Sequence, residues 1–145
     1  MKDPIYYGET LYQSKDLSDK AIEYLEVLPP EVTHLITRGS SGNCIASAML
    51  ALSNRKLRHY HLRKNDEQAH SGGTVGYKPY DGHIAAIVDD FAETGNTIIE
   101  MLKQLNYTSI VIKYIIINTP HEDIKRYLLL HHPAIQLLTG TVRNY

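Results

Sequence analysis

Two adjacent carboxylates follow a hydrophobic run, and a loop of small and hydroxylated residues follows them. The run at residues 83–88 ends at Asp89 and Asp90, and residues 94–97 begin a helical pattern after three intervening positions. Neighbouring carboxylates suit the vicinal hydroxyls of a ribose, or a magnesium ion bound to that sugar. Backbone N–H groups at a helix start, together with threonine hydroxyls, suit a phosphate group. This strand–loop–helix segment therefore has the groups to hold both ends of a ribose 5-phosphate.

The segment resembles the phosphoribosyl pyrophosphate (PRPP) motif of the type I phosphoribosyltransferases. In that motif, hydrophobic residues, two acids, a short loop and Thr-Gly-x-Thr follow one another, as they do at residues 87–97. The resemblance extends over residues 30–118. It implies transfer of the 5-phosphoribosyl group from PRPP to a nitrogen of a nucleobase, with release of pyrophosphate and Mg²⁺ as cofactor. Asp89 and Asp90 would hold the ribose hydroxyls and, through PRPP, the magnesium ion.

Two further loops are similar to parts of this family. Residues 37–42 resemble the pyrophosphate-binding loop, where Arg38 can donate charge-assisted hydrogen bonds and Gly39 gives the backbone freedom. Residues 63–82 are polar and glycine-rich, and they are similar to the flexible loop that closes over PRPP in orotate phosphoribosyltransferases. The family's second loop lysine is absent, because residues 65–68 are Asn-Asp-Glu-Gln. PRPP binding is therefore better supported by the sequence than turnover.

The resemblance assigns a set of expected site residues. The expected PRPP contacts are Arg38, Gly39, Arg63, Lys64, His70, Asp89, Asp90, Ala92, Glu93, Thr94, Gly95, Asn96 and Thr97. The candidate catalytic residues are Asp89, Asp90 and Glu93. Glu93 stands where 6-oxopurine members carry an aspartate that handles a purine proton, so it is a candidate general base. The alternative is a solvent-facing glutamate that favours a helix N-terminus. An orotate-like loop beside a purine-like Glu93 leaves the nucleobase open.

Alternating strand and helix patterns predict the scaffold that must position these residues. Runs of β-branched residues predict strands, and apolar residues at helical spacing predict helices. Strands are expected at 32–37, 57–62, 83–88, 109–117 and 135–138, with helices at 16–28, through 45–52, through 98–105 and at 119–130. This alternation predicts an α/β fold with a mostly parallel five-stranded sheet flanked by helices. Ligands of such sheets bind at the carboxyl ends of the strands.

Length and composition narrow the class of protein. A chain of 145 residues is expected to form a single domain over residues 1–145, with residues 1–16 as a possible minimal hood. The formal net charge of −1 argues against bulk nucleic-acid binding, although residues 55–64 hold five basic side chains. A single cysteine excludes an internal disulfide, and no apolar run approaches the roughly 18 residues of a membrane span. We expect a cytoplasmic protein with no membrane partner.

Two functions from different classes fit these patterns. The first is a phosphoribosyltransferase that acts on PRPP and a nucleobase, and the family resemblance implies a homodimer. The second is a PRPP- or nucleotide-binding regulator that has the same fold without turnover. The intact acid pair and the complete loops favour the enzyme, whereas the missing loop lysine and the short hood favour the regulator.

Overall fold

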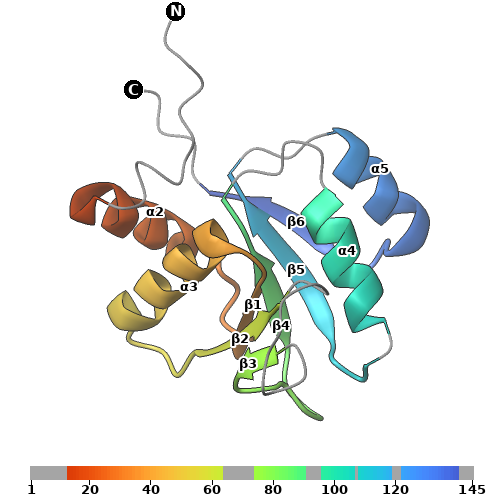
Figure 1. Ribbon diagram of the computed structural model, residues 1–145, viewed down its shortest axis with the longest axis horizontal. Coiled ribbons are helices and arrows are strands. Elements are labelled where there is room, and N and C mark those ends of the chain that lie inside the picture. The colour runs from red at the N-terminus through yellow and green to blue at the C-terminus, as the bar shows by residue number, and fades with distance from the viewer. Residues whose placement is uncertain (1–12, 64–73, 91–95, 107, 119–121, 141–145) are drawn as a thin grey trace, which may run out of the picture.

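A six-stranded sheet runs through the centre of the protein (Figure 1). The computed structural model describes residues 13–63, 74–90, 96–106, 108–118 and 122–140. The strands, in chain order, are β1 (His34–Thr37), β2 (Arg58–Leu62), β3 (Thr74–Gly76), β4 (Ala85–Val88), β5 (Ile112–Ile117) and β6 (Gln136–Thr139). They lie in the order β3-β2-β1-β4-β5-β6.

The five expected strands pair in parallel, which confirms the predicted sheet. The prediction of a continuous loop over residues 63–82 is wrong at residues 74–76, where β3 pairs antiparallel with β2. This short edge strand pairs with one other strand, and its sequence lacks the run of apolar residues that predicts a strand. At Gly76, φ is +104° and an added Cβ would lie 2.2 Å from the carbonyl oxygen of His59. Glycine therefore allows the close pairing of β3 with β2.

Within the described residues, four helices cover the two faces of the sheet (Figure 1). They are α2 (Ser14–Val27), α3 (Ser40–Leu52), α4 (Asn96–Leu105) and α5 (Glu122–His131). The cores show that α2 and α3 pack on one face and α4 and α5 on the other. Residues 14–16 of the expected hood belong to α2, and residues 1–12 lie outside the described residues. Within the described part of the chain, no helix is long and apolar enough to cross a membrane.

Strand β4 is buried on both faces, which explains its uninterrupted apolar sequence. All four of its side chains are fully buried. Successive side chains of a strand point to opposite faces, so Ala86 and Val88 pack with α2 and α3, while Ala85 and Ile87 pack with α4 and α5. Packing from both sides fixes the end of β4, where the acid pair begins.

The chain reverses its direction of winding between β1 and β4. From β1 it passes through α3 to β2 on one side, whereas β4 pairs with the other side of β1. Such a switch point opens a crevice at the carboxyl ends of the two strands, where open α/β sheets bind ligands. The residues that directly follow β1 and β4 are Arg38 and Asp89. The topology thus places two of the expected site segments beside this crevice.

Helix α3 approaches β4 closely at Gly42. An added Cβ there would lie 2.9 Å from the carbonyl oxygen of Val88 and 3.4 Å from the Cβ of Thr37. The first of these atoms belongs to the backbone of a buried strand, so the contact has little room to relax. A side chain at this position would have to push α3 away from the sheet.

We expect Gly42→Ala to lower the free energy of unfolding. Overpacking costs about 1–3 kcal/mol, which exceeds the roughly 1 kcal/mol by which alanine is the better helix former. Chemical denaturation of the variant and the wild type measures the difference. Ser47→Ala, at an exposed position of the same helix, is the control and should be nearly neutral. A Gly42→Ala variant as stable as the wild type would contradict the tight contact.

Candidate functional site

The carboxyl edge of the sheet gathers a cation and two acids from two neighbouring strands. Arg38 follows β1, and Asp89 and Asp90 follow β4; their exposed fractions are 7%, 8% and 9%. The first turn of α3 borders the acids, because an added Cβ at Gly42 would lie 3.6 Å from Oδ1 of Asp89. Three buried ionisable groups therefore lie where the topology predicts a ligand crevice.

The loop after β1 is shaped by Gly39 and held by its arginine. Gly39 has φ +101°, a conformation that L side chains rarely adopt, and it stands immediately before α3. Nη1 of Arg38 donates a 2.6 Å hydrogen bond to Oε2 of Glu100 on α4. The Arg38 side chain thus connects the end of β1 with the helix that begins at Asn96 and Thr97, whose side chains are exposed.

A polar cluster fixes the last residue of β1. The hydroxyl of Thr37 lies 2.5 Å from Oδ1 of Asn43 and 2.6 Å from Nε2 of His59. An amide oxygen only accepts, so the hydroxyl donates to Asn43 and accepts from a protonated Nε2 of His59. Burial, together with the neighbouring His61, lowers the pKa of His59 to about 4, so this imidazole is neutral near pH 7. The cluster joins β1, β2 and α3 beneath the loop that carries Arg38.

The acid pair has an unusual electrostatic state. Burial raises the pKa of Asp89 to about 8, and a side-chain hydrogen bond with Asp90 and the charge of Asp90 act in the same direction. The backbone N–H of Asp90 also donates to Oδ1 of Asp89 at 2.8 Å, which partly opposes the rise in pKa. A cation placed against the pair would favour the ionised form of Asp89. The pair is therefore suited to a positively charged or hydroxyl-bearing ligand.

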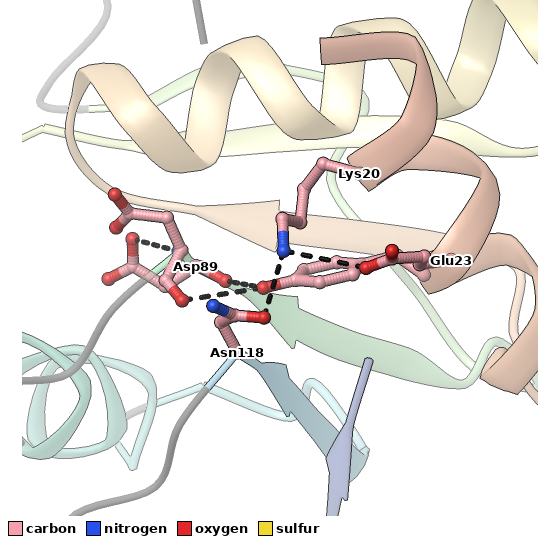
Figure 2. A network of polar contacts seen from close by, with 6 residues as sticks. Lys20, Glu23, Asp89 and Asn118 are labelled. Carbon is pink, nitrogen blue, oxygen red and sulfur yellow. Dashed lines mark hydrogen bonds and ion pairs between the residues drawn. The ribbon is translucent and has the colours of Figure 1, made fainter. Parts of the chain in front are cut away.

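A second network holds the backbone that carries the acids (Figure 2). The hydroxyl of Tyr24 on α2 donates to the carbonyl oxygen of Asp89 at 2.6 Å and lies 3.5 Å from that of Asp90. The backbone N–H of Asn118, just after β5, donates to the same Asp90 carbonyl at 2.9 Å. Both carbonyls are thus fixed from outside β4, which sets the direction in which the two carboxyl groups leave the strand.

The same network continues outward through Lys20 (Figure 2). Its Nζ donates to Oδ1 of Asn118 at 2.8 Å and lies 3.4 Å from the carboxylate of Glu23. Glu23 is only 3% exposed, and Tyr24 beside it is fully buried. The sequence reasoning missed these positioning residues. Polar residues on the buried side of the helix at 16–28 were the signal that could have identified them.

The described residues include part of the predicted site. Arg63 follows β2, the neighbour of β1, so it lies at the same edge of the sheet as Arg38. Six expected contacts lie outside the described residues: Lys64, His70, Ala92, Glu93, Thr94 and Gly95. The assignment of individual ligand contacts stays a prediction.

We expect Asp89→Asn to make the protein more stable at high pH. The folded protein holds a proton at Asp89 more tightly than the unfolded chain, so its free energy of unfolding falls as the pH rises from about 4 to about 8. The asparagine variant does not lose stability in this way. The difference in free energy of unfolding between the variant and the wild type should therefore grow, in favour of the variant, by about 1–3 kcal/mol between pH 5 and pH 8. Denaturant unfolding of both proteins across this range measures it. Asp81→Asn, at an exposed acid, is the control, and its stability difference from the wild type should not change in this way with pH. If the stability difference of Asp89→Asn were equally independent of pH, the raised pKa would be refuted.

Comparison with known proteins adds one sequence relative. No family model matches the sequence. The transcriptional regulator GfcR of Methanosarcina mazei is 34% identical over 98 residues, which cover 65% of this chain and 48% of that protein. The match therefore spans about half the length of the curated relative.

Solved structures establish the fold. The orotate phosphoribosyltransferase of Mycobacterium tuberculosis H37Rv, in complex with 5-phospho-alpha-D-ribosyl 1-diphosphate, matches with a TM-score of 0.76 over 94% of this chain and 78% of that chain, at 9% identity. The adenine phosphoribosyltransferase of Thermoanaerobacter pseudethanolicus matches with a TM-score of 0.64 over 89% and 81%, at 14% identity. The strand order, the helices on both faces and these similarities agree: the chain has the fold of the type I phosphoribosyltransferases.

Proposed function

We propose that the protein binds PRPP with Mg²⁺ at the carboxyl edge of its sheet and transfers the 5-phosphoribosyl group to a nucleobase. The observation that carries this proposal is the buried pair Asp89–Asp90 at the end of β4, beside the loop of Arg38. Burying two acids side by side opposes folding unless a ligand or a cation makes use of them. The solved relative in complex with PRPP supports the choice of ligand.

The proposed site divides the ligand among three segments. Asp89 and Asp90 hold the ribose hydroxyls, and residues 94–97 hold the 5-phosphate at the start of α4. The diphosphate lies against Arg38 and Gly39, together with Arg63, Lys64 and His70. The arginine and lysine side chains oppose the negative charge of the diphosphate, and charge-assisted hydrogen bonds are among the strongest that a protein makes.

The donor set fits a magnesium ion that is shared with the ligand. Magnesium is usually bound by one or two carboxylates together with water and substrate oxygens. Among the described residues, no cluster of three or more His, Cys, Asp or Glu side chains forms a complete metal site. Asp89 and Asp90 would hold the ion through PRPP, where it would neutralise charge on the diphosphate. A nearby cation would also lower the pKa of Asp89 and ionise it.

Transfer requires one bond to break and one to form at the anomeric carbon. The carbon–oxygen bond to the diphosphate breaks, and the diphosphate leaves with both electrons. A ring nitrogen of the base supplies the electron pair of the new bond, and Glu93 accepts the proton that this nitrogen loses. The ionised acids stabilise the positive charge that develops on the sugar, and the arginines and the lysine stabilise the leaving diphosphate.

A PRPP-binding regulator without turnover is the second candidate. One observation favours it: the sequence match to a transcriptional regulator reaches 34% identity, whereas the phosphoribosyltransferases above match at 9–14%. The missing loop lysine points the same way. Both candidates use the same ligand site, so ligand binding and turnover must be measured separately.

Binding of PRPP should raise the melting temperature when Mg²⁺ is present, because a ligand that binds only the native state stabilises it. The double variant Asp89→Asn/Asp90→Asn should lose most of this ligand-induced shift, as measured by thermal unfolding with and without PRPP. The matched control is Glu26→Gln/Asp81→Asn, which removes two charges from exposed positions and should keep the shift. An unaltered shift in the double aspartate variant would remove the acids from the site.

Turnover should appear as pyrophosphate release from PRPP with one of hypoxanthine, guanine, xanthine or orotate. With a purine, Glu93→Gln should lower turnover by roughly 10²–10⁴-fold, the range typical of a general base, while PRPP binding changes little. Full activity of the variant on a purine would refute the base role, and activity on orotate alone would assign a pyrimidine substrate. PRPP binding without release for any base would favour the regulator.

A further inference from the structure

Arg38 is a buried cation whose hydrogen bonds are incomplete. Its side chain is 7% exposed, and Nη1 donates to Glu100 at 2.6 Å. Its Nε is buried and has no hydrogen-bond partner. A guanidinium has five N–H donors in a planar fork, which matches phosphate oxygens that accept two bonds at once. The unsatisfied Nε indicates that a ligand, rather than the protein alone, completes the hydrogen bonding of Arg38.

Glu100, the partner of Arg38, is exposed where the arginine is buried. Its side chain is 63% exposed, so water can solvate the carboxylate as soon as it leaves the arginine. It is the fifth residue of α4, one turn beyond Asn96, and it reaches across to the loop that follows β1. Ion pairs with a largely exposed member are weak because solvent screens them. The released carboxylate would be solvated, so the cost of separating the pair falls on the buried guanidinium, and another anion at Arg38 would offset that cost.

We propose that Glu100 is an internal stand-in for a diphosphate oxygen, so that ligand binding at Arg38 is an exchange of one anion for another. This inference rests on the proposed function, because it assumes that the diphosphate lies against Arg38. In the ligand-free protein Glu100 neutralises the buried guanidinium. In the complex, the diphosphate takes over Arg38 and satisfies Nε, and Glu100 turns to solvent.

The exchange gives the site a selectivity that the acid pair alone lacks. A ligand with a diphosphate supplies enough charge to displace the carboxylate. Ribose 5-phosphate has no group for Arg38, so it leaves the Arg38–Glu100 pair intact. Glu100 thus acts as a specificity-determining residue: it lowers the affinity for every ligand that must displace it and is indifferent to ligands that do not.

Isothermal titration with Mg²⁺ and pyrophosphate, PRPP or ribose 5-phosphate tests the exchange. Glu100→Gln keeps the shape of the side chain and removes its charge. We expect this variant to bind pyrophosphate and PRPP roughly 3- to 10-fold more tightly than the wild type, as removal of a weak competing ion pair allows. Its affinity for ribose 5-phosphate should not change. Glu26→Gln on α2, which removes the same charge from an exposed position, should leave all three affinities unchanged. Circular dichroism confirms that each variant is folded before titration.

The background Arg38→Gln shows whether the gain passes through the arginine. There, Glu100→Gln should bring no further gain for pyrophosphate. An equal gain in that background would overturn the exchange, because general charge repulsion would then explain the effect. Unchanged or weaker pyrophosphate binding by Glu100→Gln would also overturn the exchange. If the wild type still bound PRPP in that case, the proposed function would not be affected. Failure of both the wild type and Glu100→Gln to bind PRPP would refute both proposals.

Discussion

The burial of two adjacent carboxyl groups is the constraint to which the rest of the site is adapted. Asp89 and Asp90 are 8% and 9% exposed, and burial raises the pKa of Asp89, with the hydrogen bond to Asp90 and the charge of Asp90 acting in the same direction. Apolar residues at these positions would make a more stable protein. The fully buried side chains of β4 provide apolar burial on both faces of the sheet, directly before the acids. The two buried acids thus lie at the end of a strand whose side chains are all fully buried.

The surrounding helices and strands hold the segment that carries the acids in place. Tyr24 reaches the Asp89 carbonyl from α2, and Asn118 reaches the Asp90 carbonyl from the end of β5. The ring of Tyr24 is itself confined, because an added Cβ at Gly140 would lie 3.0 Å from it. The geometry of the acids therefore depends on how α2 docks, far from the acids in the sequence. A site built in this way is sensitive to residues that never touch a ligand.

Local patterns made the scaffold and the acids predictable from the sequence. The continuous apolar run before Asp89 predicts a strand buried on both faces, and that strand is β4. Contacts that join distant segments carry no such signal. The Arg38–Glu100 pair spans 62 positions, and the sequence reasoning considered Arg38 only as a ligand contact. Strand β3 was missed because it has a single partner and depends on the glycine at position 76 rather than on an apolar pattern.

The described part of the site holds more of the groups that ligand binding would need than of the groups that turnover would need. Arg38 and the backbone of the two acids are held by hydrogen bonds from α2, α4 and Asn118 just after β5. Under the proposed function, a bound sugar diphosphate would use Arg38 and both acids whether or not it reacts. Turnover needs additional cations on the leaving group and a group that accepts the proton of the base. Under the proposed function those roles fall to Lys64, His70 and Glu93, which lie outside the described residues. Substitutions at such positions can remove catalysis and leave the binding site intact, so an enzyme and a ligand-sensing regulator can share this scaffold.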